Sequence, residues 1–250
     1  MNKLITRRSA IVAGLAAAGG LILARSPRQL PPTYGNLLRL GDDLTYAAHR
    51  VLLPGQSLVK EYSYTDITSF PAIGTTNPAA SENAFTADEY KTLQTDAFSD
   101  WQLSVEGSVA KPRTFSIAEL KQLPSRTQIT RHTCEEGWSA IGQWTGVPLS
   151  IVLDAVGILP SARFVAYSSI DDWIDSIDLF DALHPQTILA YGMNGRDLPI
   201  PHGAPLRLRV ETQLGAKSIK YLNRLVVLDE FDDGGLRGSI RNGWAWDMGI

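Results

Sequence analysis

The chain has a single cysteine, Cys134, among its 250 residues, so no disulfide can form within it. Its hydrophobic content of 44% and charged content of 20% describe a globular chain that is able to bury a core. Cys134 lies in the run RHTCEEGW at 131–138, where two acids and a glycine disfavour deep burial of the loop. A thiolate is a nucleophile and a soft-metal ligand, and the basic Arg131 and His132 would lower the pKa of the thiol. We therefore expect Cys134 to have a chemical role.

Residues 1–24 have the composition of an export signal. Lys3, Arg7 and Arg8 precede the run 9–24, which contains only apolar or small residues. Paired arginines before a weakly hydrophobic run are typical of a twin-arginine signal, a route used by proteins that fold in the cytoplasm, often around a cofactor. The run of 16 residues is shorter than the roughly 20 that span a bilayer. We expect a periplasmic protein, with 1–24 removed as a signal or retained as a membrane anchor.

The charge of the chain excludes one class of partner. The formal net charge is −3, and loss of the three cations in residues 1–24 would take it to −6. Non-specific binding of nucleic acid needs a basic face, so we expect no nucleic-acid partner.

The next part of the chain, residues 25–99, carries six prolines and no clear periodicity. This pattern predicts an extended arm that packs on a core. Within it, Asn77 followed by Pro78 predicts a turn. Thr86 with Glu89 three residues later predicts the start of a short helix.

Residues 100–250 read as the core, with strands and helices in irregular alternation. The polar and apolar alternation over 102–107 predicts a half-buried strand. Ser116 and Glu119 form a capping box for a helix that stops before Pro124. Further strands are expected at 127–134, 163–170 and 206–211, and a further helix at 148–156. The absence of regular strand–helix–strand units indicates an α+β fold with Cys134 at the end of a strand.

Two segments after Cys134 place cations among small residues. On the last expected strand, Arg207 and Arg209 share the face opposite the apolar side chains. That face is either solvated or an anion site, since the guanidinium fork suits phosphate. In Gly215, Ala216 and Lys217, small residues would let backbone amides and an ammonium approach one oxyanion together.

Three runs of this chain resemble, in order, the motifs of a known family. They are RHTCEEGWSAIGQWTGVPLSIVLDAVG, FVAYSS and HPQTILAYGMNGRDLPIPHGAPLRLRVETQLGAKSIKYLNRLVVLDEF. Together they resemble the sulfite-oxidase-like molybdopterin domain, and most of all its exported bacterial branch, which includes periplasmic methionine sulfoxide reductase catalytic subunits. The resemblance covers about 100–250. It implies a mixed sulfite-oxidase-type fold, a Mo-molybdopterin cofactor and two-electron oxygen-atom transfer at molybdenum.

The resemblance also implies roles for individual residues. Cys134 would ligate molybdenum beside the two dithiolene sulfurs of one pyranopterin, as suits a soft thiolate. Arg207 matches the phosphate-binding arginine of the family, and Lys217, with Gly215 and Ala216, matches its Gly-x-Lys segment. Three more cofactor contacts are implied by position: Asn77 in the arm, Ser169 where relatives carry Thr, and His202 where the reductase type carries Asn.

Partners follow from the same resemblance. The chain has no C-x-x-C-H haem-attachment motif, so electrons would be exchanged with another protein, by family analogy a membrane cytochrome b. The substrate would be a small molecule such as sulfite, a sulfoxide or a related compound. The chain ends soon after its last motif and leaves no room for the immunoglobulin-like dimerisation domain of sulfite oxidases, so we expect a monomeric catalytic subunit.

Two other functions remain open at this point. Cys134 could be the nucleophile of a thiol hydrolase, with His184 or His202 as its base. The chain could also be a non-catalytic periplasmic binding protein that kept the fold and lost the metal. The acidic run at 171–178 does not have the spacing of a calcium loop, so we interpret it as a solvated face or the rim of a substrate channel.

Overall fold

The computed structural model describes residues 36–52, 57–231, 238–239 and 242–250. The chain divides into two compact units, 1–54 and 55–250. In the first unit, the described part is one helix, α2 (Asn36–Leu52). The twin-arginine signal expected at 1–24 lies outside the described residues. Within the described segments, no helix combines the length and apolar character needed to cross a membrane.

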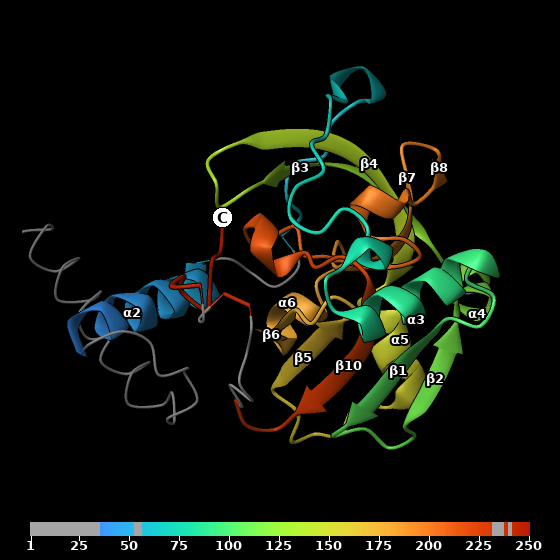
Figure 1. The fold of residues 1–250 in the computed structure, drawn as a ribbon. Coiled ribbons are helices and arrows are strands. Elements are labelled where there is room, and N and C mark those ends of the chain that lie inside the picture. The colour runs from blue at the N-terminus through green and yellow to red at the C-terminus, as the bar shows by residue number, and fades with distance from the viewer. Residues whose placement is uncertain (1–35, 53–56, 232–237, 240–241) are drawn as a thin grey trace, which may run out of the picture. The chain divides into compact units, whose positions relative to one another are not determined.

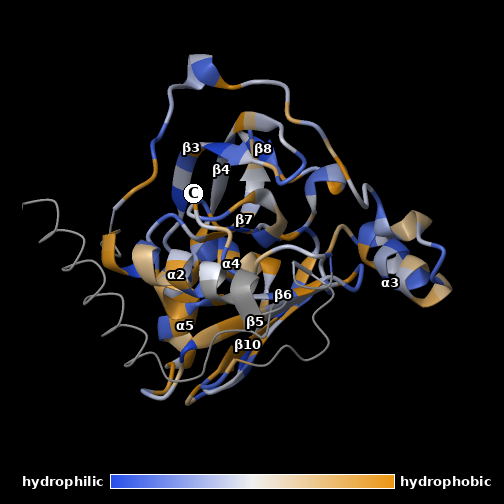
Figure 2. Cartoon of the chain, turned by 90° about the vertical axis from the view of Figure 1, so that its left-hand side faces the viewer, coloured by the Kyte–Doolittle hydropathy of each residue, from blue (hydrophilic) through white to orange (hydrophobic). Residues whose placement is uncertain are grey.

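In the second unit, five strands form a sheet in the order β2-β1-β10-β5-β6 (Figure 1). These strands are β1 (Gln102–Gly107), β2 (Arg113–Ser116), β5 (Phe164–Ser169), β6 (Ile174–Asp178) and β10 (Leu222–Leu228). The strands β1 and β10 run parallel, and the other neighbours are antiparallel. Alternate side chains of a strand point to one face, and Leu103, Val105, Leu225 and Val227 are accordingly buried. The apolar character of β5 and β10 is visible in orange in Figure 2.

Five more strands form a second sheet, which is antiparallel throughout. Its strands are β3 (Arg126–Thr133), β4 (Ser139–Pro148), β7 (Ile188–Met193), β8 (Arg196–Asp197) and β9 (Arg207–Arg209). The order is β3-β4-β7-β8, and β9 pairs with β7 as well.

Helices and one large core complete this unit. The helices are α3 (Ala84–Thr95), α4 (Ile117–Gln122), α5 (Leu149–Val156) and α6 (Leu179–Ala182), and the 3-10 turns are η1 (Tyr64–Asp66), η2 (Pro78–Ala80), η3 (Ile200–His202) and η4 (Gly215–Lys217). Buried side chains of α5 pack in one hydrophobic cluster with residues of both sheets, among them Leu153, Leu189 and Leu225. Helices and two sheets combined in this way confirm the α+β prediction.

Local sequence signals predicted several elements correctly. Ser116 Oγ accepts a hydrogen bond from Glu119 N (3.2 Å), while Glu119 Oε2 accepts one from Ser116 N (2.8 Å), which is the expected capping box. The helix expected at 148–156 is α5. The predicted start of α3 at Thr86 is wrong, because Asn83 Oδ1 accepts from Phe85 N (3.1 Å) and caps the helix earlier.

The proline-rich arm contains more helix than its sequence suggested. Helix α2 falls in a long stretch without proline, between Pro32 and Pro54, where no ring prevents helical hydrogen bonds. Residues 57–99 belong to the same compact unit as the two sheets. The division into an arm at 25–99 and a catalytic domain at 100–250 stays a prediction.

Gly146 should be the glycine of β4 least tolerant of a side chain. The register of β4 against β7 shifts between Thr145 and Gly146, and a Cβ on Gly146 would lie 2.7 Å from Ala190 Cα. Gly146→Ala should lower the free energy of unfolding by about 1–3 kcal/mol, because backbone atoms must move. Gly142→Ala is the control in urea denaturation, since its Cβ would meet a movable atom, Phe70 Cδ2, at 3.3 Å. Equal losses in the two variants would contradict this expectation.

Candidate functional site

Cys134 begins the tight turn that joins β3 to β4, so it lies at the end of a strand as the sequence predicts. Backbone hydrogen bonds close the turn, from Cys134 N to Trp138 O (2.9 Å) and from Gly137 N to Cys134 O (3.1 Å). Gly137 has a φ of 91°, a conformation that favours glycine. Glu136 and Gly137 are exposed, yet Cys134 itself is only 3% exposed. The turn therefore directs the thiol inward.

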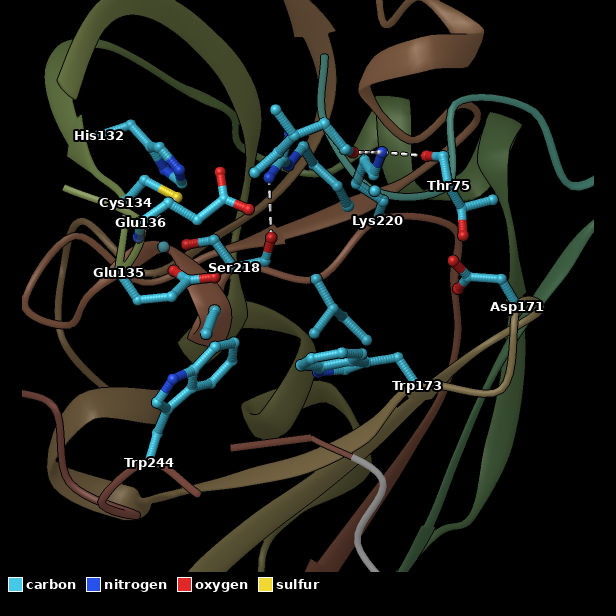
Figure 3. Close-up of a pocket in the computed structure, with 16 residues that line it drawn as sticks. Thr75, His132, Cys134, Glu135, Glu136, Asp171, Trp173, Ser218, Lys220 and Trp244 are labelled. Carbon is cyan, nitrogen blue, oxygen red and sulfur yellow. Dashed lines mark hydrogen bonds between the residues drawn. The ribbon is translucent and has the colours of Figure 1, made fainter. Parts of the chain in front are cut away.

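The thiol faces a cavity of about 340 Å³ (Figure 3). Four parts of the chain form most of its wall: the arm at 73–75, the residues around the turn after β3, the loop at 171–173 after β5, and the stretch 215–220 after β9. Figure 3 shows Cys134 and Glu136 on one side of the cavity and Thr75 and Asp171 on the other. Asp171 thus agrees with the channel-rim interpretation of the acidic run.

The surroundings of Cys134 keep its thiol protonated in the free protein. Burial raises the pKa of the Cys134 thiol to about 11, and the negative charges of Glu135 and Glu136 add to the rise. At neutral pH the group is therefore a thiol. A soft metal ion that binds this sulfur would displace its proton.

The two basic residues before Cys134 do not lower its pKa, so that expectation is wrong. Arg131 is exposed, and its guanidinium lies 5.4 Å from the centre of the Tyr62 ring. His132 is buried and lines the cavity. Burial, followed by the positive charges of Arg209 and Arg207, lowers the pKa of His132 to about 2. Its ring is therefore neutral.

Strand β9 carries its arginines in the interior, so the solvated-face alternative is wrong. Arg207 and Arg209 are 5% and 1% exposed. Arg207 donates from Nη1 to His202 O (3.1 Å) and from Nη2 to Ser218 O (2.7 Å). Its Nε is buried and has no hydrogen-bond partner among the described residues. Because Arg207 lines the cavity, this N–H is available to an anionic group placed there.

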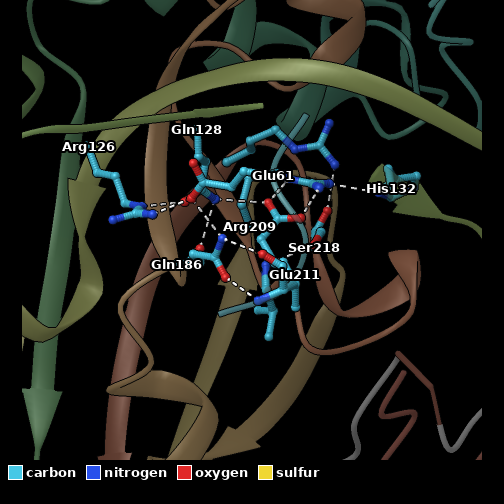
Figure 4. Close-up of polar contacts among 11 residues, drawn as sticks. Glu61, Arg126, Gln128, His132, Gln186, Arg209, Glu211 and Ser218 are labelled. Atoms are coloured by element: carbon cyan, nitrogen blue, oxygen red, sulfur yellow. Dashed lines mark hydrogen bonds and ion pairs between the residues drawn. The ribbon is translucent and has the colours of Figure 1, made fainter. Parts of the chain in front are cut away.

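Arg209 binds its neighbours through all three guanidinium nitrogens (Figure 4). Nε and Nη2 donate to the two carboxylate oxygens of Glu211, at 3.0 and 2.8 Å. Nη1 lies 2.7 Å from His132 Nδ1. Gln128 Nε2 donates to Glu211 Oε1 (3.1 Å) and completes this buried cluster. The alternation of arginines on β9 was visible in the sequence, but these partners were not.

Lys217 is placed differently from the other residues of its segment. Its Nζ donates to Asp175 Oδ1 (2.6 Å) and to Ser176 O (3.0 Å), and both members of the ion pair are fully buried. Gly215 and Ala216 line the cavity, whereas Lys217 does not. A contact between Lys217 and the cofactor phosphate stays a prediction. The solvated-face interpretation is wrong for Asp175, which is buried by this pair.

Lys220 lines the cavity but was not identified from the sequence. Its Nζ donates to three backbone carbonyls, those of Ile73 (2.7 Å), Thr75 and Pro201 (3.2 Å). Burial lowers the pKa of Lys220 to about 8, and the charge of Arg207 contributes. The only sequence signal was its position at the end of the run LGAKSIK, where nothing distinguishes its ammonium from that of Lys217.

The three remaining predicted contacts lie beside the cavity rather than on its wall. Asn77 Oδ1 accepts from Ala79 N (3.1 Å) and caps η2. Ser169 Oγ donates to Asp171 Oδ1 (2.6 Å) and so shapes the loop that does line it. His202 accepts from Arg207 through its carbonyl oxygen. Direct contacts of Asn77, Ser169 and His202 with a cofactor stay predictions.

The hydrolase alternative required His184 or His202 as its base, and neither of these two histidines lines the cavity. His184 is buried, with Nε2 at 2.9 Å from Ser57 O and with Nδ1 accepting from Gln186 N (3.2 Å). His132 lines the cavity, but Arg209 already occupies its Nδ1. The geometry favours Cys134 as a ligand rather than as a nucleophile with a paired base.

Comparison with known proteins identifies the class. Residues 90–235 match the oxidoreductase molybdopterin binding domain, more than half of the chain. The protein therefore belongs to this family of molybdopterin-binding oxidoreductases. The resemblance inferred from the three sequence runs is confirmed.

Two individual relatives show which members of the family this chain resembles. The chain is 41% identical over 152 residues to "Putative protein-methionine-sulfoxide reductase subunit YedZ1" of Azospira oryzae, covering 61% of this chain and 57% of that one. It is 36% identical over 151 residues to the protein-methionine-sulfoxide reductase catalytic subunit MsrP of Xanthomonas axonopodis pv. citri, covering 54% and 47%. The chain thus spans about half the length of these curated relatives.

A solved structure shares the fold. The sulfane dehydrogenase SoxCD from Paracoccus pantotrophus superposes with a TM-score of 0.52 at 24% identity, covering 54% of this chain and 40% of that one. At this identity the likeness concerns the fold alone.

The residues on the cavity wall fit a molybdenum–pterin group. Cys134 offers a soft sulfur donor, and Arg207 offers a buried N–H without a partner among the described residues. Gly215 presents bare backbone, since a Cβ there would lie 2.5 Å from His132 Nε2. A metal ligand, an N–H donor for an anion and an unobstructed stretch of backbone therefore lie around the same cavity.

Lys217 should contribute strongly to the stability of the fold. Lys217→Met would leave the buried Asp175 carboxylate without its counter-charge, and the loss in free energy of unfolding should be about 3–5 kcal/mol. Lys121→Met is the control, since Lys121 pairs with Asp197 at the surface and should cost less than about 1 kcal/mol. Urea denaturation of both variants compares the two losses, and a small loss for Lys217→Met would show that its ammonium is not structural.

His202 should make folding sensitive to mild acid. Burial, with the charges of Arg207 and Lys220, lowers the pKa of His202 to about 4, below the ordinary value near 6.5. The unfolded chain therefore takes up this proton first, so stability present above pH 6.5 is lost as pH falls towards 4. In His202→Asn, the free energy of unfolding should fall less steeply across this window. An unchanged slope would contradict the attribution of this acid sensitivity to His202.

Proposed function

We propose that this protein is the catalytic subunit of an exported molybdenum-dependent reductase that removes the oxygen atom from methionine sulfoxide. Membership of the molybdopterin-binding oxidoreductase family supports the cofactor, and the names of two relatives support the substrate. The observation that carries the proposal is geometric. The only thiol of the chain faces the same cavity as the buried Nε of Arg207, for which the described residues offer no hydrogen-bond partner.

Each wall of the cavity has a role in this proposal. Cys134 would bind the metal through its thiolate, and Arg207 would hold the anionic phosphate of the pterin. When bound, the group supplies a two-electron reaction in which a sulfoxide, two electrons and two protons give a thioether and water. Trp173 and Trp244 line the cavity as aromatic surfaces that exclude water and suit a sulfur-containing side chain.

The electrons need a donor outside this chain. We propose a membrane cytochrome b, in keeping with the absence of a haem-attachment motif from the sequence. The paired arginines Arg7 and Arg8 support export of the protein to the periplasm by the twin-arginine route. The chain would then work as a single catalytic subunit against its membrane partner.

Removal of the thiol tests the proposal. In Cys134→Ser, purified from the native export pathway, the molybdenum content should fall below the wild-type value of about one atom per chain, because one of the soft ligands is lost. Reduction of methionine sulfoxide with a viologen dye as electron donor should disappear, because any metal that remains lacks its thiolate ligand. Elemental mass spectrometry and dye oxidation give the two readouts.

The control is Ser139→Ala, an exposed position at the other end of the same turn, which should keep both the metal and the activity. Thermal unfolding of Cys134→Ser should match that of metal-free wild type, so that a folding defect is recognised. Full turnover in Cys134→Ser would overturn the proposal.

A further inference from the structure

Beside Cys134, the buried side chain of His132 is held by Arg209, which does not itself line the cavity. We propose that Arg209 is a positioning residue that holds His132 as the neutral tautomer with its proton on Nε2, so that this N–H donates to the oxygen atom of the substrate. The role of the N–H rests on the proposed function. The tautomer itself does not depend on it.

The contact between the two side chains decides which nitrogen carries the proton. Arg209 Nη1 lies 2.7 Å from His132 Nδ1. A guanidinium has donors only, so Nδ1 must accept with its lone pair. The proton of a neutral imidazole then resides on Nε2, because the bond made by one ring nitrogen sets the state of the other.

Arg209 cannot turn away from this contact. Glu211 holds Nε and Nη2 through both of its carboxylate oxygens, and only Nη1 is left for the histidine. The guanidinium carbon also lies 4.5 Å from the centre of the Trp144 ring. Arg209, Glu211 and Trp144 are all fully buried, so water does not compete with these contacts.

The imidazole ring is held in place as well. A Cβ on Gly215 would lie 2.5 Å from His132 Nε2 and 3.4 Å from Cys134 Cα, so the Nε2 edge rests against bare backbone beside the cysteine. The rings of Phe70 and Trp138 pack around it, with centroids at 5.2 and 5.4 Å. A flip of the ring would break the contact with Arg209.

These constraints leave one N–H of His132 for the cavity. His132 and Cys134 both line it, and among the described residues none accepts a hydrogen bond from His132 Nε2. A neutral donor next to the metal ligand would bind an oxygen atom, such as that of a sulfoxide. A donor already oriented costs no rearrangement when the oxygen arrives.

Nitrogen-15 NMR of histidine-labelled full-length protein at pH 7 tests the tautomer directly. The chain has four histidines, and His132 is assigned by the signal that disappears in His132→Gln. The expected result is a pure Nε2–H tautomer in both metal-free and molybdenum-loaded wild type. A proton on Nδ1, or a mixture of tautomers, would overturn the proposal.

A paired variant tests the role of Arg209. Arg209→Met with Glu211→Leu removes both charges together, which keeps the interior free of an unpaired ion. The His132 signal should then become a mixture of tautomers, while Arg126→Gln, at the exposed end of the same network, should leave it pure. A pure Nε2–H signal in the paired variant would show that Arg209 does not set the tautomer.

Kinetics of the molybdenum-loaded enzyme test whether His132 Nε2–H donates to the substrate. His132→Phe should lower kcat for methionine sulfoxide at least tenfold with unchanged molybdenum content. Loss of activity through loss of metal would instead point to a structural role of His132 and overturn its role as a donor. If the wild type holds no molybdenum or leaves methionine sulfoxide unreduced, the proposed function fails while the NMR result still decides the tautomer.

Discussion

The burial of two arginines on the three-residue strand β9 is the constraint on which this site depends. Their guanidinium carbons lie 5.0 and 4.5 Å from the centre of the same buried ring, that of Trp144. Such charges are tolerated in an interior only when partners surround them. Arg209 is fully paired with Glu211 and His132, whereas the Nε–H of Arg207 at the cavity has no partner within the described part of the chain. Arg209 thus stabilises the wall of the site, while Arg207 remains available to an anion.

The network of polar contacts around Arg209 extends well beyond the cavity, and part of it comes from the proline-rich arm. Glu61 accepts from Gln186 Nε2 (2.9 Å) and pairs with Arg126, which donates from Nε to Gln128 Oε1 (2.9 Å). Gln128 in turn reaches Glu211. Lys220 ties the next part of the arm, at Ile73 and Thr75, to the cavity wall. The residues before the sheets are therefore part of the site.

Features determined by neighbouring residues could be predicted from the sequence. The capping box of Ser116 and the placement of Cys134 at the end of a strand depend on a few positions each. Lys217 and Lys220 could not be told apart, because Asp175, 42 positions away, takes the ammonium of Lys217. The pKa of Cys134 was misjudged for a related reason. Arg131 and His132 were expected to place positive charge beside the thiol, but the fold turns Arg131 to the surface and leaves His132 neutral.

The central claim, that Cys134 binds the metal, has a direct test because the chain has one cysteine. Selenocysteine incorporated at position 134 places a single selenium at the site, apart from any methionine label. X-ray absorption at the selenium edge of the molybdenum-loaded protein should then show molybdenum as a direct neighbour of selenium. Selenium with carbon as its only bonded neighbour, in a protein that holds its molybdenum, would contradict the claim.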